Sequence, residues 1–141
     1  MKNQRLIAAS RIIIFLGEGA LATFSRRIAP YVKAELLKAS QNQQSKDYAK
    51  AFTHLENAHV LGQESTYWHV KVHCLMMLWG IRQQDVTETF GQLIRIIGAA
   101  ALTAINGVPV GNTGGSNVSP MKSMPISPEH AAIIAKVKAN A

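Results

Sequence analysis

Residues 56–73 read ENAHVLGQESTYWHVKVH, and this stretch decides the fold because it holds two helical segments and the break between them. Glu56 and His59 are three positions apart, and His69 and His73 are four positions apart. On an α-helix these spacings place the two members of each pair within about 60° of one another. The side chains of each pair therefore point in one direction.

The break between the two segments is short, Gly-Gln-Glu-Ser at residues 62–65. We predict that Gly62 is the glycine that follows the first helix and that Ser65 caps the second. Two helices joined in this way form an antiparallel hairpin. Counting outward from the turn sets position 59 level with about position 68, and position 56 level with about position 71. The hairpin is therefore expected to bring both pairs of side chains to one height.

Imidazole and carboxylate groups are ligands of zinc and iron first, and also of manganese and nickel. We therefore predict a transition metal site made by Glu56, His59, His69 and His73. Glu56 lies in an apolar run, where an unpaired carboxylate is costly to bury. This cost would be removed by a bound cation, by Lys50, by a neighbouring histidine or by exposure to solvent. The alternative is that the histidines serve only in packing and hydrogen bonding. No catalytic residue is assigned, and no organic cofactor is expected.

A later helix, expected at about residues 85–105, adds polar side chains to the same region. Glu88, Gln92 and Arg95 follow an i, i+4, i+7 pattern and share one face within about 60°. Antiparallel counting sets Gln92 level with about position 74, so we predict that it is a ligand or an outer partner of His73, with Glu88 a turn farther away. Arg95 is expected either to pair with a nearby glutamate or to bind an anionic substrate.

The rest of the chain predicts an all-α fold, a small antiparallel helical bundle with a Gly/Pro-rich C-terminal strap and a short terminal helix. The first helix is expected at about residues 20–39, with a kink or restart at Pro30, and a linker follows at 40–45. The next helices are expected at about 46–61, capped by Ser45, and at 66–81, which is the central buried helix. A last helix is expected at about 128–138. The Gly/Asn-rich loop at 111–117 is interpreted as a tight backbone path over the bundle rather than an anion nest. This loop starts on the side of the proposed site and is placed to cover it.

With 141 residues, the chain is expected to form one domain at residues 21–141, preceded by an N-terminal extension at 1–20. A single cysteine, Cys74, excludes an intramolecular disulfide framework and suits the cytoplasm. The apolar run from Leu6 to Leu16 is too short to span a bilayer, so no stable membrane insertion is expected. The net charge is +7. No nucleic-acid motif accompanies the basic residues, so nucleic acid is not expected as a partner.

From about Phe24 to its end, the chain resembles a small bacterial family known as domain of unknown function 3703. The residues that carry the resemblance are Leu55-Glu56-x-x-His59-Val60-Leu61-Gly62-Gln63, His69-x-x-x-His73, Gly91-Gln92 and Pro109-x-Gly111-Asn112-Thr113-Gly114-Gly115-x-Asn117-Val118. The resemblance implies a small cytoplasmic helical protein of bacteria without an assigned activity. The first twenty or so residues lie outside the family pattern.

These observations lead to one main hypothesis and two alternatives. The main hypothesis is a metal-binding helical bundle that serves metal handling or a metal-dependent reaction. The alternatives are a metal-free interaction module that dimerises or docks a partner, and a small redox or hydrolytic metalloenzyme. Bundles with two metal ions need two Glu-x-x-His motifs, and one is present here. A second chain would supply the second Glu-x-x-His motif, and the apolar helices offer a surface for it, so a homodimer is favoured.

Overall fold

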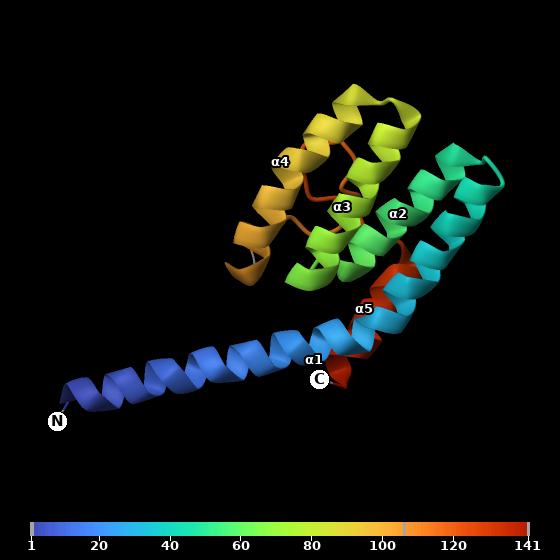
Figure 1. Ribbon diagram of the computed structural model, residues 1–141. Coiled ribbons are helices and arrows are strands. Elements are labelled where there is room, and N and C mark those ends of the chain that lie inside the picture. Colours follow the sequence, from blue (N-terminus) through green and yellow to red (C-terminus); the bar gives the residue numbers. More distant parts are fainter. Residues whose placement is uncertain (1, 106, 141) are drawn as a thin grey trace.

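The computed structural model describes residues 2–105 and 107–140, with side chains from residue 22 onward except that of Ala104. Within these residues there is no strand, and the helices are α1 (Lys2–Gln44), α2 (Tyr48–Gly62), α3 (Thr66–Gln83), α4 (Val86–Leu102), the 3-10 turn η1 (Thr103–Ile105) and α5 (Pro128–Ala139). Figure 1 shows α1 with α2 and α3 with α4 as neighbouring antiparallel pairs, with α5 packed against α1 and α2. The predicted all-α fold is confirmed.

The helix α1 carries the predicted apolar stripe, since Phe24, Ile28 and Val32 are buried in the core. Pro30 lies inside this helix and does not end it. Figure 1 shows the axis of α1 changing direction partway along its length. A proline inside a helix removes one backbone hydrogen bond and crowds the preceding turn, which is the physical reason for a bend.

The first part of α1 projects away from the other helices in Figure 1. The division of the chain at residue 20 into an extension and a domain stays a prediction. At its other end α1 runs to Gln44, so the linker expected at residues 40–45 is wrong for all but its last residue.

The start of α2 also differs from the prediction. Asp47, not Ser45, is its N-cap, and the carboxylate of Asp47 accepts a hydrogen bond from the backbone N–H of Lys50 at 3.2 Å. Lys46 has a φ of +65°, and this left-handed residue reverses the chain after α1. The reversal occupies residues 45 and 46, so α2 begins two residues later than expected.

A buried carboxylate ties α1 to α2. Glu35 accepts hydrogen bonds from Lys38 Nζ and from His54 Nδ1, both at 2.7 Å, and from Asn57 Nδ2 at 3.1 Å. Burial by itself raises the pKa of Glu35, but the hydrogen bonds from Lys38, His54 and Asn57 together lower it below its usual value. His54 is therefore engaged in an α1–α2 contact.

The hairpin between α2 and α3 forms at the predicted place, with one difference. Gly62 is the last residue of α2, and Gln63 follows it in a right-handed conformation, so the expected role of Gly62 as a left-handed residue after the helix is wrong. A Cβ on Gly62 would lie 2.7 Å from the Cβ of Trp68, so glycine here permits a close approach of the two helices. Ser65 caps α3 as predicted, because its Oγ accepts from the N–H of Trp68 at 3.3 Å.

The helix α3 buries one face and not its whole surface. Trp68, Val72 and Met76 lie in the core, whereas Tyr67 and Ile81 are 60% and 53% exposed. The expectation that residues 66–81 form a helix buried all round is therefore wrong. The apolar composition of this segment reflects exposed positions as well as core positions.

The helix α4 and η1 together span Val86–Ile105, which agrees with the predicted helix at about 85–105. Residues 107–127 then contain no helix and form the predicted strap, which returns past α3 and α4 to α5 (Figure 1). In the part of the chain that the structure describes, no helix is long and apolar enough to cross a membrane.

Candidate metal centre

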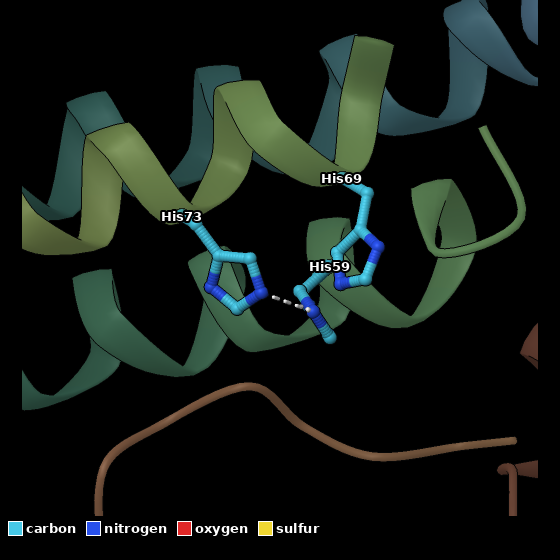
Figure 2. Close-up of side chains that lie close together, drawn as sticks. All are labelled: His59, His69 and His73. Atoms are coloured by element: carbon cyan, nitrogen blue, oxygen red, sulfur yellow. Dashed lines mark hydrogen bonds between the residues drawn. The ribbon is translucent and has the colours of Figure 1, made fainter. Parts of the chain in front are cut away.

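Three histidine side chains meet between α2 and α3. Figure 2 shows the rings of His59, from α2, and of His69 and His73, from α3, pointing toward one another. One ring nitrogen from each lies within 4.8 Å of the others, and His59 Nε2 is 3.1 Å from His73 Nε2. The rings are almost completely buried, with 2%, 4% and 2% of each residue exposed in chain order. The structure thus brings together three of the four predicted ligands.

The opposite nitrogen of each ring is held by an oxygen atom. His59 Nδ1 is 2.9 Å from the backbone carbonyl of Asn112, and His69 Nδ1 is 2.6 Å from Thr103 Oγ1. His73 Nδ1 is 2.6 Å from Gln92 Oε1. Metal-bound histidines commonly have this arrangement, in which an outer hydrogen bond fixes the ring and turns the other nitrogen toward the ion.

These partners assign the hydrogens on two of the rings. The Asn112 carbonyl only accepts hydrogen bonds, so His59 Nδ1 carries a hydrogen. Gln92 Nε2 donates to Glu88 Oε1 at 2.5 Å and to the carbonyl of Gly114 at 2.8 Å, which leaves Gln92 Oε1 as the acceptor for His73 Nδ1. The Nε2 atoms of His59 and His73 therefore both present lone pairs, with no hydrogen between them unless one ring is charged.

The surroundings disfavour a charged ring. Burial, with smaller contributions from His73, His69 and Arg95, lowers the pKa of His59 well below its usual value. Burial chiefly lowers the pKa of His69 to about 3 and that of His73 to about 4. At neutral pH two lone pairs thus face each other across 3.1 Å. Two imidazole nitrogens on a tetrahedral zinc ion, each at about 2.0–2.1 Å from it, lie about 3.3 Å apart, so the spacing of this pair suits two ligands of one cation.

Glu56 does not join the group of ligand atoms within the described residues. Its carboxylate is hydrogen-bonded to Thr113, and burial is the main cause that raises its pKa, with Glu88 adding to the effect. A Cβ on Gly115 would lie 3.2 Å from Glu56 Oε1, so this carboxylate lies beside the strap. The prediction that Glu56 is a fourth ligand has no support from this geometry.

The three predicted residues of α4 hold the strap against the histidines. Glu88 Oε2 accepts from the backbone N–H of Ser116 at 2.9 Å, and Gln92 links Glu88 to His73. Arg95 Nη2 donates to the carbonyl of Gly115 at 2.9 Å and to that of Val118. Among the residues that the structure describes, Arg95 forms no ion pair with a glutamate.

The strap reaches the site through conformations that require glycine. Gly114 has a φ of +86°, and a Cβ there would lie 2.8 Å from the ring of His59. The side chain of Asn112 fixes the loop, because its Nδ2 donates to the carbonyls of Ser119 and Lys122 at 2.9 and 2.7 Å. Its backbone carbonyl is thereby held toward His59.

Sequence reasoning missed two residues that complete the site. Thr103 holds His69, and the buried Gln63 accepts from the N–H of Gly111 at 3.1 Å and donates to the carbonyl of Pro109. Thr103 could have been found from the sequence, because it is the one residue with a hydroxyl group in the otherwise apolar run at 96–105. Gln63 lay in the hairpin turn and gave no comparable signal.

Substitution of Gly114 by alanine is expected to destabilise the protein by about 1–2 kcal/mol from the left-handed backbone alone. The new methyl group also displaces His59 or the strap, which we expect to weaken metal binding by about 10- to 100-fold, as loss of an outer partner does. Urea unfolding and metal titration measure the two effects. Gly98→Ala is the matched control, because a Cβ at Gly98 meets nothing within 4 Å. Equal metal affinity in both variants would contradict the proposed contact.

Comparison with known proteins adds a family assignment. The family model described as "Protein of unknown function (DUF3703)" matches residues 26–134 and therefore includes the three histidines, Gln92 and the strap. No curated protein and no solved structure matches the chain.

Proposed function

The chain belongs to the DUF3703 family, and we propose that it binds one divalent transition metal ion through Nε2 of His59, His69 and His73. The observation that carries this proposal is the 3.1 Å approach of two Nε2 atoms whose rings have both placed their hydrogens on Nδ1. A cation between the rings turns this repulsion into coordination. Zinc and ferrous iron suit a set of imidazole ligands best, and manganese and nickel come next.

Three histidines leave one position of a tetrahedral ion for water or another ligand. Sites with three protein ligands and one exchangeable position are typical of catalysis, whereas structural zinc sites close all four positions. The same open position would let a metal-handling protein pass its ion to a partner. The proposed function is therefore metal handling or a metal-dependent reaction, at a site that exchanges its fourth ligand.

The test is a metal titration of protein purified without a metal-affinity tag and stripped with a chelator. We expect one Zn²⁺ ion per chain, measured by calorimetry and by elemental analysis after dialysis. Because the ligand nitrogens are already neutral and oriented, binding is expected to release few protons at pH 7. Retention of less than about 0.2 ion per chain would refute the proposal.

A second candidate function is an interaction module, and it is favoured by the outer face of α4. Val86, Phe90, Leu93 and Ile97 follow one another at helical spacing and are 67%, 64%, 50% and 67% exposed. An apolar stripe of this length on an exposed helix marks an interaction surface. A second copy of the chain is the predicted occupant, with the two α4 helices antiparallel about a two-fold axis.

Phe90→Glu is expected to convert a dimer of this kind into a monomer, because the new carboxylate faces its own copy across apolar surface. Sedimentation velocity at several protein concentrations measures the change. Leu37→Glu is the matched control, since Leu37 is also exposed, at 60%, but lies on α1. A wild-type chain that stays monomeric at about 100 μM would exclude a stable α4 dimer.

A further inference from the structure

A cavity of about 220 Å³ adjoins the three histidines. Its other lining residues include Arg95 and the apolar side chains of Leu102, Val108 and Met121. One water needs about 10–15 Å³ of such a volume, so the cavity exceeds what one metal-bound water needs. Ile94 and Met121, which also line it, are 69% and 66% exposed, so the cavity meets solvent.

The charged side chain that lines this cavity is positive. Among the described residues that line it none is an aspartate or glutamate, and Arg95 is the charged one. Arg95 donates hydrogen bonds to the carbonyls of Gly115 and Val118, which carry no net charge, and the carboxylate of Glu88 acts on it electrostatically. A divalent ion held by three neutral imidazoles keeps its double charge. Metal and Arg95 together would place about three positive charges beside the cavity, and Glu88 offsets one of them, so the net positive charge favours an anion.

The distribution of polar and apolar groups narrows the kind of anion. The histidines, Arg95, Gln63 and Asn112 supply the polar part of the lining, and Ile94, Leu102 and Val108 supply apolar surface. An inorganic oxyanion would gain the charge interactions but would face apolar side chains with its remaining oxygens, which is unfavourable. An anion with a short alkyl chain satisfies both parts of the lining.

We propose that the cavity binds a short-chain carboxylate, with one carboxylate oxygen on the fourth position of the metal ion and the alkyl chain against Ile94, Leu102 and Val108. This inference rests on the proposed metal site. It identifies the class of molecule that the site takes as ligand or substrate. Arg95 adds a second positive group for the same carboxylate.

The experiment uses the full chain loaded with Co²⁺, whose visible absorption responds to a change of ligand. Butyrate is the probe, butyramide is its uncharged counterpart of similar shape, and inorganic phosphate is the oxyanion without an alkyl chain. We expect a saturable change of the Co²⁺ spectrum with butyrate, and at least about tenfold weaker responses with the other two, because each lacks one of the two features.

Two variants at exposed isoleucines locate the ligand. Ile94→Glu places a negative charge at the rim of the cavity and is expected to weaken butyrate binding about tenfold. Ile81→Glu makes the same change on α3 at a 53% exposed residue that does not line the cavity, so its effect is expected to stay within about twofold. Both variants should still bind one Co²⁺ per chain.

The outcomes separate this inference from the proposed function. One Co²⁺ per chain with no response to butyrate, or with equal responses to butyrate and butyramide, overturns the carboxylate proposal and leaves the metal site standing. A stronger response to phosphate than to butyrate also overturns it. Equal weakening by Ile94→Glu and Ile81→Glu overturns the proposal, because the ligand then binds elsewhere. Absence of bound Co²⁺ overturns both proposals.

Discussion

The double replacement His59→Ala/His69→Ala is expected to abolish stoichiometric metal binding. A protein zinc site has an apparent binding free energy of about 10–16 kcal/mol, so each of three or four ligands accounts for about 3 kcal/mol. Loss of two ligands therefore costs about 6 kcal/mol, which is roughly 10⁴-fold in Kd. Chelator-competition titration with Zn²⁺ and elemental analysis after dialysis both measure this loss. The rise in thermal stability that metal gives the wild-type chain should disappear with it.

A matched control separates loss of ligands from loss of structure. His54 lies on the same helix as His59, but its ring contacts Glu35 on α1 rather than the cluster. His54→Ala removes that hydrogen bond and should leave the metal stoichiometry unchanged. Circular dichroism of the metal-free double variant checks that the helices persist. Wild-type affinity in a folded double variant would mean that the ion binds elsewhere on the chain.

The histidine cluster was predictable because it depends on local geometry. Two histidines four residues apart share a helix face whatever surrounds them, and Ser65 marks the start of their helix. A short turn then fixes the height at which His59 meets them. The error about Gly62 did not disturb this result, because ending α2 one residue later changes the register of the hairpin little.

The position of the Glu56 carboxylate and the outer partner of His59 were not predictable in the same way. Glu56 has the right spacing from His59, but its carboxylate lies beside the strap, whose path no local pattern determines. The partner of His59 is the backbone carbonyl of Asn112, 53 positions away, and a carbonyl has no signature in the sequence. Gln92 was foreseen near His73 because side chains on a regular helix can be counted.

The metal-free protein is expected to lose much of its stability between pH 7 and pH 5. In the folded chain the pKa of His69 is about 3 and that of His73 about 4, because burial disfavours the charged rings. In the unfolded chain both are near 6.5, so on acidification the unfolded state takes up protons first. The contribution of these rings to stability is therefore complete above about pH 6.5 and declines from there toward about pH 4 and pH 3.

The size of this effect follows from linkage. Each ring lowers the free energy of unfolding by about 1.4 kcal/mol per pH unit below 6.5. His69 and His73 together therefore lower it by about 4 kcal/mol at pH 5. Most domains have only about 5–15 kcal/mol of stability, so the urea midpoint in the presence of a chelator should fall steeply. The raised pKa of Glu56 acts in the opposite direction, because the folded state takes up that proton first.

The variant His59→Ala/His69→Ala provides the control for this acid sensitivity. With two of the three buried rings removed, its stability is expected to decline less between pH 7 and pH 5, even if it starts lower because of the cavities that the substitutions leave. Bound Zn²⁺ should raise the stability of the wild-type chain by a similar amount at pH 7 and at pH 5, since the folded rings are already neutral at both values. Equal urea midpoints of the metal-free wild-type chain at the two pH values would mean that the three rings are not held neutral. The repulsion between their Nε2 atoms, on which the metal site is argued, would then be relieved by a proton.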